Sequence, residues 1–130
     1  MWSLQVRTHR RVVFTDITSE VAALVRDRGD GLVTVFVPHT TAGVTINENA
    51  DPSVRDDLEM ALDRLVPAGL PFTHLEGNSD AHMKASLMGS SVCVPVQNGA
   101  LQLGTWQGIY FAEFDGPRNR RTLVTFTPAA

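Results

Sequence analysis

Residues 92–103, Val-Cys-Val-Pro-Val-Gln-Asn-Gly-Ala-Leu-Gln-Leu, decide the fold class of this chain. Asn98-Gly99 lies between two apolar runs, Val92–Gln97 and Leu101–Leu103, and this is the strongest short signal of a β-hairpin because both turn positions need positive φ. Two more strand-like runs follow, Trp106–Phe114 and Arg121–Phe126, and we expect them to pair with each other around Asp115-Gly116-Pro117. The C-terminal third is therefore predicted to be antiparallel β-structure.

Working back towards the N-terminus, strand-like and helix-like patterns alternate. The chain order is β-β-α-β-β-α-α before the C-terminal three or four strands, which predicts a single α+β domain over residues 1–130 with largely antiparallel sheets and three helices. Leu32–Val37 is mostly apolar, so we expect a central strand buried on both faces, with the lone Cys93 also buried in its strand. The other early strands are expected at Leu4–Thr8, Val12–Ile17 and Gly43–Ile46. The three helices are expected after Thr18 or Ser19, from Asp51-Pro52, and over Asp80–Met88.

Helix ends follow from side chains that can accept a backbone hydrogen bond. Thr18 or Ser19, Asp51 and Ser79 are the expected N-terminal caps, and Pro52 suits a first turn. Gly89 is expected to close the last helix with a left-handed backbone.

Charge and composition exclude several classes of protein. The formal net charge is −3 with a pI near 5.7, which argues against a general nucleic-acid binder. Arg118, Arg120 and Arg121 form the only dense basic run, which is either a solvated turn or a phosphate-binding edge. There is no signal-peptide pattern and no apolar run of about 20 residues, so we expect a cytoplasmic protein without a membrane span.

Three of the four histidines are candidate metal ligands. His39 follows the buried strand at Pro38, while His74 and His82 flank a polar loop containing a glycine. Three imidazoles leave a tetrahedral ion one position for water or substrate, although isolated histidines are also common as hydrogen-bonded structural groups. His9, among arginines, is expected at the surface.

Polar residues near these histidines supply the remaining candidates. Glu48 and Glu113 are candidate acid–base groups, because Glu113 lies in an otherwise apolar strand and needs a partner or a function. Arg118 could be that partner. For Asp51 and Ser79, a role in a turn or helix cap is as good an interpretation as a role beside the histidines of the site.

Three long motifs carry a family resemblance. They are His39-Thr-Thr-Ala-Gly-Val-Thr-Ile-Asn-Glu-Asn-Ala-Asp-Pro52, then His74-Leu-Glu-Gly-Asn-Ser-Asp-Ala-His-Met-Lys-Ala-Ser-Leu-Met-Gly-Ser-Ser91, and then Leu103-Gly-Thr-Trp-Gln-Gly-Ile-Tyr110 with Glu113-Phe-Asp-Gly-Pro-Arg118. In this order they resemble the YjbQ-like family, also called the secondary thiamine-phosphate synthase family. Members often carry cysteine just before the glutamate of the third motif, where this chain has Ala112, so a cysteine nucleophile or ligand is absent at that position.

The resemblance implies a β-sandwich-like α+β fold, a homotrimer, a metal site of His39, His74 and His82, and a weak thiamine-phosphate synthase activity. The resulting hypothesis is a metal-dependent enzyme, a transferase, acting on a phosphorylated small molecule with a divalent metal, zinc in preference to magnesium. The alternatives are a non-enzymatic trimeric module that binds a metal or small phosphorylated ligand, and a zinc-dependent hydrolase. The hypothesis assigns catalysis to Glu48, Glu113 and Arg118, and ligand binding to Asn47, Asn78, Ser79 and Lys84.

Overall fold

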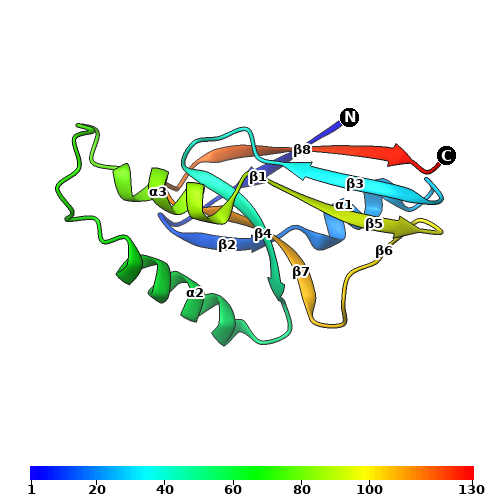
Figure 1. Cartoon of the computed structure of the whole chain (residues 1–130), viewed down its shortest axis with the longest axis horizontal. Helices are drawn as coiled ribbons and strands as arrows, with labels where there is room; N and C mark the ends of the chain where they lie inside the picture. Colours follow the sequence, from blue (N-terminus) through cyan, green and yellow to red (C-terminus); the bar gives the residue numbers. More distant parts are fainter.

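Three helices and eight strands make up the computed structural model, which describes all 130 residues (Figure 1). The α+β class and the three predicted helices are confirmed. In chain order the elements are β1 Trp2–Arg7, β2 Val13–Asp16, α1 Thr18–Val25, β3 Gly31–Phe36, β4 Ala42–Glu48, α2 Pro52–Leu65, α3 Ser79–Met88, β5 Ser91–Gln97, β6 Ala100–Leu101, β7 Gln107–Glu113 and β8 Asn119–Pro128.

The strands form two antiparallel sheets. One has five strands in the order β1-β8-β3-β5-β6, and the other has three in the order β2-β7-β4. Valines of β3 and β8 pack against Ile109 and Phe111 of β7 and against Val21 and Val25 of α1, so the main core lies between the sheets. A second cluster around Phe14 and Tyr110 packs against α2 and α3, which lie on the side of the three-stranded sheet (Figure 1).

Strand β3 is central, between β8 and β5, but only one of its faces is buried. Val33 and Val35 are fully buried, whereas Leu32 and Phe36 on the other face are 45% and 42% exposed. The prediction of burial on both faces is wrong because the second sheet covers only the inner face of the five-stranded sheet. Cys93, also predicted to be buried, is exposed on the same outer face, where it is paired in register with Thr34.

The hairpin at Asn98-Gly99 is confirmed, with φ of 51° and 74° at the two turn residues. The expected pairing of β7 with β8 is wrong. Strand β7 lies between β2 and β4, and β8 lies between β1 and β3, because the chain crosses from one sheet to the other after Glu113.

The helix caps are partly as expected. Asp51 accepts a hydrogen bond from the Ser53 N–H at the start of α2, and Gly89 ends α3 with φ of 95°. The capping role predicted for Thr18 or Ser19 is wrong, since Asp16 instead accepts from both the N–H and the hydroxyl of Thr18. The cap predicted at Ser79 is also wrong: Ser79 is the first helical residue, and the helix has no side-chain cap bond. No helix is long and apolar enough to cross a membrane.

Candidate functional site

Two adjoining clefts share His39, Thr40 and Ser90, and together they are called the joined cleft here. The first, of about 580 Å³, runs from His39 to His82 along α3, where Ser86 adds a hydroxyl. The second, of about 470 Å³, extends over the end of β3 to Arg120. The joined cleft therefore brings together histidines from two of the three sequence motifs.

His39 lies just past the end of β3 and its ring is fixed by the neighbouring strand. Its Nε2 accepts a hydrogen bond from the Arg121 N–H at 3.1 Å, so the neutral ring carries its proton on Nδ1. Burial, reinforced by the charge of Arg120, holds the pKa of His39 below its usual value. At neutral pH His39 is thus a hydrogen-bond donor through Nδ1, and its basic nitrogen is already engaged.

His82 is the other imidazole of the joined cleft. Its ring packs edge-on to His74, with a distance of 5.3 Å between the ring centroids. His74 lies in the exposed loop before α3, with its Nε2 3.6 Å from a Glu76 oxygen, and it does not line the joined cleft. No hydrogen bond to either His82 ring nitrogen occurs within the chain, which leaves that ring available for proton transfer.

The three histidines predicted as metal ligands do not form a metal-binding group within one chain. Nowhere do three or more His, Cys, Asp or Glu side chains gather in an arrangement that could hold an ion. The donor chemistry points the same way, because the Nε2 lone pair of His39 is occupied by the Arg121 N–H. The residues of a single chain therefore do not fit the expected zinc ion.

Glu113 and Arg120 form a buried ion pair beneath the joined cleft. Their side chains are 0% and 6% exposed, and the Arg120 Nε donates to Glu113 Oε1 at 2.8 Å. Burial alone would raise the pKa of Glu113, but hydrogen bonds from Arg120, Thr8 and backbone N–H groups outweigh it and hold the pKa below its ordinary value. Glu113 is thus an ionised anchor at neutral pH. Arg118, predicted as its partner, instead pairs with Asp115 at 3.0 Å.

The ion pair orients Arg120 towards the joined cleft. Its Nε and Nη2 are bound to Glu113, and Nη2 also donates to Thr41 Oγ1 at 2.8 Å. Its Nη1 makes none of these bonds. Because Nη1 is unpaired but is not one of the fully buried unpaired atoms, it is accessible from outside the protein. Arg120 lines the joined cleft, so Nη1 is the guanidinium nitrogen that remains free to bind a ligand there.

The remaining predicted residues lie outside the joined cleft. Strand β4 starts beside the cleft at Ala42 and ends at Glu48, about 20 Å away at 3.3 Å per residue, so Glu48 and its neighbour Asn47 are remote. Asn78 donates to Asp115 at 2.9 Å, and Ser79 is buried at the first residue of α3.

Lys84 and Asp80 fix α3 to the body of the protein. Lys84 is 2% exposed, and its Nζ lies 3.6 Å from Asp80 and 3.5 Å from Asp63 of α2. Arg11 donates to Asp80 at 3.0 Å, and although burial raises the pKa of this carboxyl, that hydrogen bond and the charges of Arg11 and Lys84 together outweigh it and keep the pKa low. The network fixes the helix that carries His82.

Sequence reasoning missed Arg120 and Ser90 as site residues. The basic run at 118–121 was the available signal for Arg120. Nothing in the local sequence distinguishes Ser90 from its neighbours.

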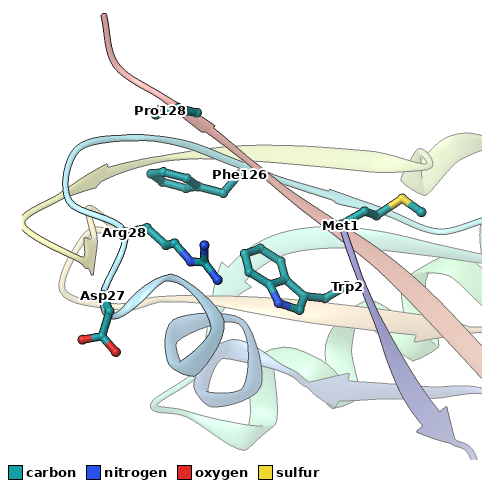
Figure 2. A pocket seen from close by; sticks show the side chains of 6 residues that line it. All are labelled: Met1, Trp2, Asp27, Arg28, Phe126 and Pro128. Atoms are coloured by element: carbon teal, nitrogen blue, oxygen red, sulfur yellow. The ribbon is translucent and has the colours of Figure 1, made fainter.

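A further cleft lies at the opposite end of β3, where Gly31 pairs with Pro128. Figure 2 shows Arg28 beside the Trp2 ring, 4.9 Å from its centroid, with Phe126 nearby. This cleft of about 570 Å³ contains no histidine or thiol, and Asp27 is its one carboxylate.

Comparison with known proteins identifies relatives along almost the entire chain. The family profile described as UPF0047 protein YjbQ-like matches residues 2–129. The UPF0047 protein MJ1081 of Methanocaldococcus jannaschii is 50% identical over 126 residues, covering 95% of this chain and 91% of the relative. YugU of Bacillus subtilis is 51% identical over 125 residues, covering 94% and 95%.

Solved structures show the same fold. An uncharacterised conserved protein of this family from Clostridium acetobutylicum superposes with a TM-score of 0.95 at 50% identity, covering 98% of this chain and 100% of that one. The conserved hypothetical protein TT1486 of Thermus thermophilus gives 0.93 at 44% identity, covering 98% and 100%.

Replacing Glu113 by Gln should destabilise the fold by about 3–5 kcal/mol, because the Arg120 guanidinium would stay buried without its counter-charge. Urea denaturation measures this change. Glu59→Gln is the matched control, since its ion pair with Arg10 is at the surface and its loss should cost less than about 1 kcal/mol. Equal costs in the two variants would contradict the anchoring role.

Stability should fall as the pH drops below the ordinary His39 value of 6.5. The pKa of His39 is lower in the folded protein than in the unfolded chain, so below pH 6.5 the unfolded chain binds more protons. The stabilisation from His39 is therefore complete above pH 6.5 and is lost as the pH falls towards the folded-state pKa. Denaturation from about pH 8 to about pH 5 should show this slope. His39→Gln should reduce it, whereas the exposed-residue control His9→Gln should retain it.

Proposed function

The chain belongs to the YjbQ-like UPF0047 family, and from the geometry of its joined cleft we propose that it acts on a phosphorylated small molecule. One observation carries the proposal: Arg120, whose Nη1 has no partner in the chain, lines the cleft that His39 also lines. Charge-assisted hydrogen bonds from arginine are well suited to phosphate oxygens, and the Glu113 pair has already fixed the direction of this guanidinium. The proposal includes the expected cytoplasmic location.

Three kinds of donor would recognise the phosphate. Arg120 supplies charge, His39 supplies the Nδ1–H, and Thr40 and Ser90 supply hydroxyls. His82 is the proposed proton-transfer group, since its ring nitrogens have no partner in the chain and it lines the same cleft. Glu113 is not an acid or base in this scheme, because its low pKa and its hydrogen bonds keep it ionised.

The reaction we favour is of the thiamine-phosphate synthase type that the family resemblance implies. The ring nitrogen of the thiazole phosphate forms a bond to the methylene carbon of the pyrimidine pyrophosphate while the bond from that carbon to the pyrophosphate oxygen breaks, and His82 gives its proton to the leaving pyrophosphate. Negative charge grows on the leaving pyrophosphate as its bond breaks, and preoriented donors such as Arg120 stabilise charge that develops in the transition state.

The divalent metal and the homotrimer remain linked parts of the proposal. One chain does not gather three ligands, so the expected ion would need a further donor from a neighbouring chain. Self-association is supported by the outer face of the five-stranded sheet, which exposes Leu32 and Phe36 and is not covered by any helix. The zinc-dependent hydrolase is a variant with the same requirement.

The second candidate is a non-enzymatic module that binds the phosphorylated ligand. It is favoured by the engagement of the His39 basic nitrogen with the Arg121 N–H, which leaves no complete nucleophile–base pair in the cleft of one chain.

Turnover should depend on His82. We expect His82→Gln to lower the rate of pyrophosphate release from the two thiamine precursors by about 10²–10⁴-fold, the usual contribution of an acid–base group. Arg26→Gln, an exposed change outside the joined cleft, is the control. If the unaltered protein binds the precursors without turnover, only the non-enzymatic binding module remains. If the precursors do not bind to the joined cleft, both candidates are rejected.

Zinc should accompany assembly. In native mass spectrometry of untagged protein, we expect zinc in the trimer and none in the monomer, because one chain lacks a complete ligand set. His74→Ala and His82→Ala should each reduce it, whereas His39→Ala should not, because the Arg121 N–H occupies the Nε2 lone pair of His39. A trimer without zinc after incubation with the metal would remove zinc from the proposal.

A further inference from the structure

Positive charge is concentrated at one edge of this acidic protein. Strand β1 pairs with β8 so that Arg7 lies opposite Asn119, which brings segments 7–11 and 118–121 together. These two segments hold six of the chain's 11 lysines and arginines, although the net charge is −3. The six are Arg7, Arg10, Arg11, Arg118, Arg120 and Arg121.

A small polar cleft, called the edge cleft here, opens between the two segments. Its volume is about 350 Å³, and it shares no residue with the joined cleft. Apart from Pro117, every side chain that lines it is polar or charged. The lining residues are Arg7, Thr8, His9, Pro117, Arg118 and Asn119.

The basic side chains of the edge cleft keep N–H groups that are not bound to other parts of the chain. Arg10 and Arg11 are bound to carboxylates elsewhere, on Glu59 and Asp80. In contrast, the side chains of Arg7 and His9 make no hydrogen bond or ion pair within the chain. Arg118 donates to Asp115 through Nε and Nη2, which leaves its Nη1 free.

Backbone and side-chain bonds fix the walls of the edge cleft. The Thr8 N–H donates to the Arg118 carbonyl oxygen at 2.9 Å, and the Arg118 N–H donates to Thr8 Oγ1 at 2.9 Å. Thr8 is 3% exposed, and its hydroxyl lies 2.8 Å from Glu113 Oε1 as a donor. The floor is therefore rigid, and a ligand would meet an Arg118 guanidinium that Asp115 has already positioned.

We propose that the edge cleft is a binding site for a small phosphate-bearing anion of the size of inorganic pyrophosphate. The cleft is near the lower size limit of ligand sites, it lacks the apolar lining that a large organic ligand needs, and two arginines, Arg7 and Arg118, line it. This site is independent of the proposed function, because the buried Glu113–Arg120 pair separates it from the joined cleft.

Calorimetric titration with inorganic pyrophosphate tests the site. Arg7→Gln and Arg118→Gln should each weaken binding about tenfold, the effect of losing one charge-assisted hydrogen bond. The matched control Arg26→Gln is exposed and outside both clefts, and it should bind like the unaltered protein. No binding by the unaltered protein, or an equal loss in all three variants, overturns the proposal. Arg7 is exposed and has no partner, so its variant should fold even if Arg118→Gln does not.

Amide chemical shifts locate the anion independently. With pyrophosphate added to the full chain, shifts should change at residues 7–9 and 118–119. Changes confined to residues 39–40, 90 and 120–121 would assign the anion to the joined cleft, and they would overturn the edge site while leaving the proposed function intact.

Discussion

The Glu113–Arg120 ion pair is the interaction on which the rest of the structure depends. Three of the connections that cross between the two sheets, those after β1, after β3 and after β7, contribute to this pair. Thr8 comes from the first crossing, Thr41 from the second, and the N–H groups of Phe114 and Asp115 from the third. Figure 1 shows these crossings at the end of the sandwich that carries α3. A single ion pair thus joins three connections that are distant in sequence.

Such a pair is stable only when every charge is fully hydrogen-bonded. Removing two ions from water is expensive, and mutual attraction offsets that cost only when further hydrogen bonds satisfy the remaining polar atoms. Glu113 accepts from five donors, two of them on Arg120. Because its geometry is so constrained, the pair specifies how the two sheets meet and where His39, in the second crossing, must lie.

The sequence was sufficient for features that depend on local chemistry. The turn at Asn98-Gly99, the cap at Asp51 and the need of Glu113 for a partner all follow from nearby residues, and all are confirmed. The choice between Arg118 and Arg120 is different, because it depends on strand parity. Strand β8 begins at Asn119, so Arg120 and Thr122 point inward. That starting point is set by pairing with β1 and β3, which local sequence does not reveal.

The histidines show the same limit. Three long motifs were enough to predict the family and the sandwich, but not where each imidazole points. His39 was predicted as a ligand by its position after a strand, yet the backbone N–H of Arg121, 82 residues away, occupies its Nε2. Likewise, alternation within β5 buries Val94 and Val96 and so exposes Cys93, although the residue type favours burial.

Local charge, rather than net charge, then explains how an acidic protein can present two clefts suited to anions. The acidic residues of α2 and α3 neutralise Arg10, Arg11 and Lys84, whereas Arg120 is neutralised from below and keeps one nitrogen for the joined cleft. Electrostatic potentials at clefts depend on nearby groups more than on the total. Glu113 therefore has two effects at once: it fixes the arginine that lines the joined cleft and, through Thr8, the floor of the edge cleft.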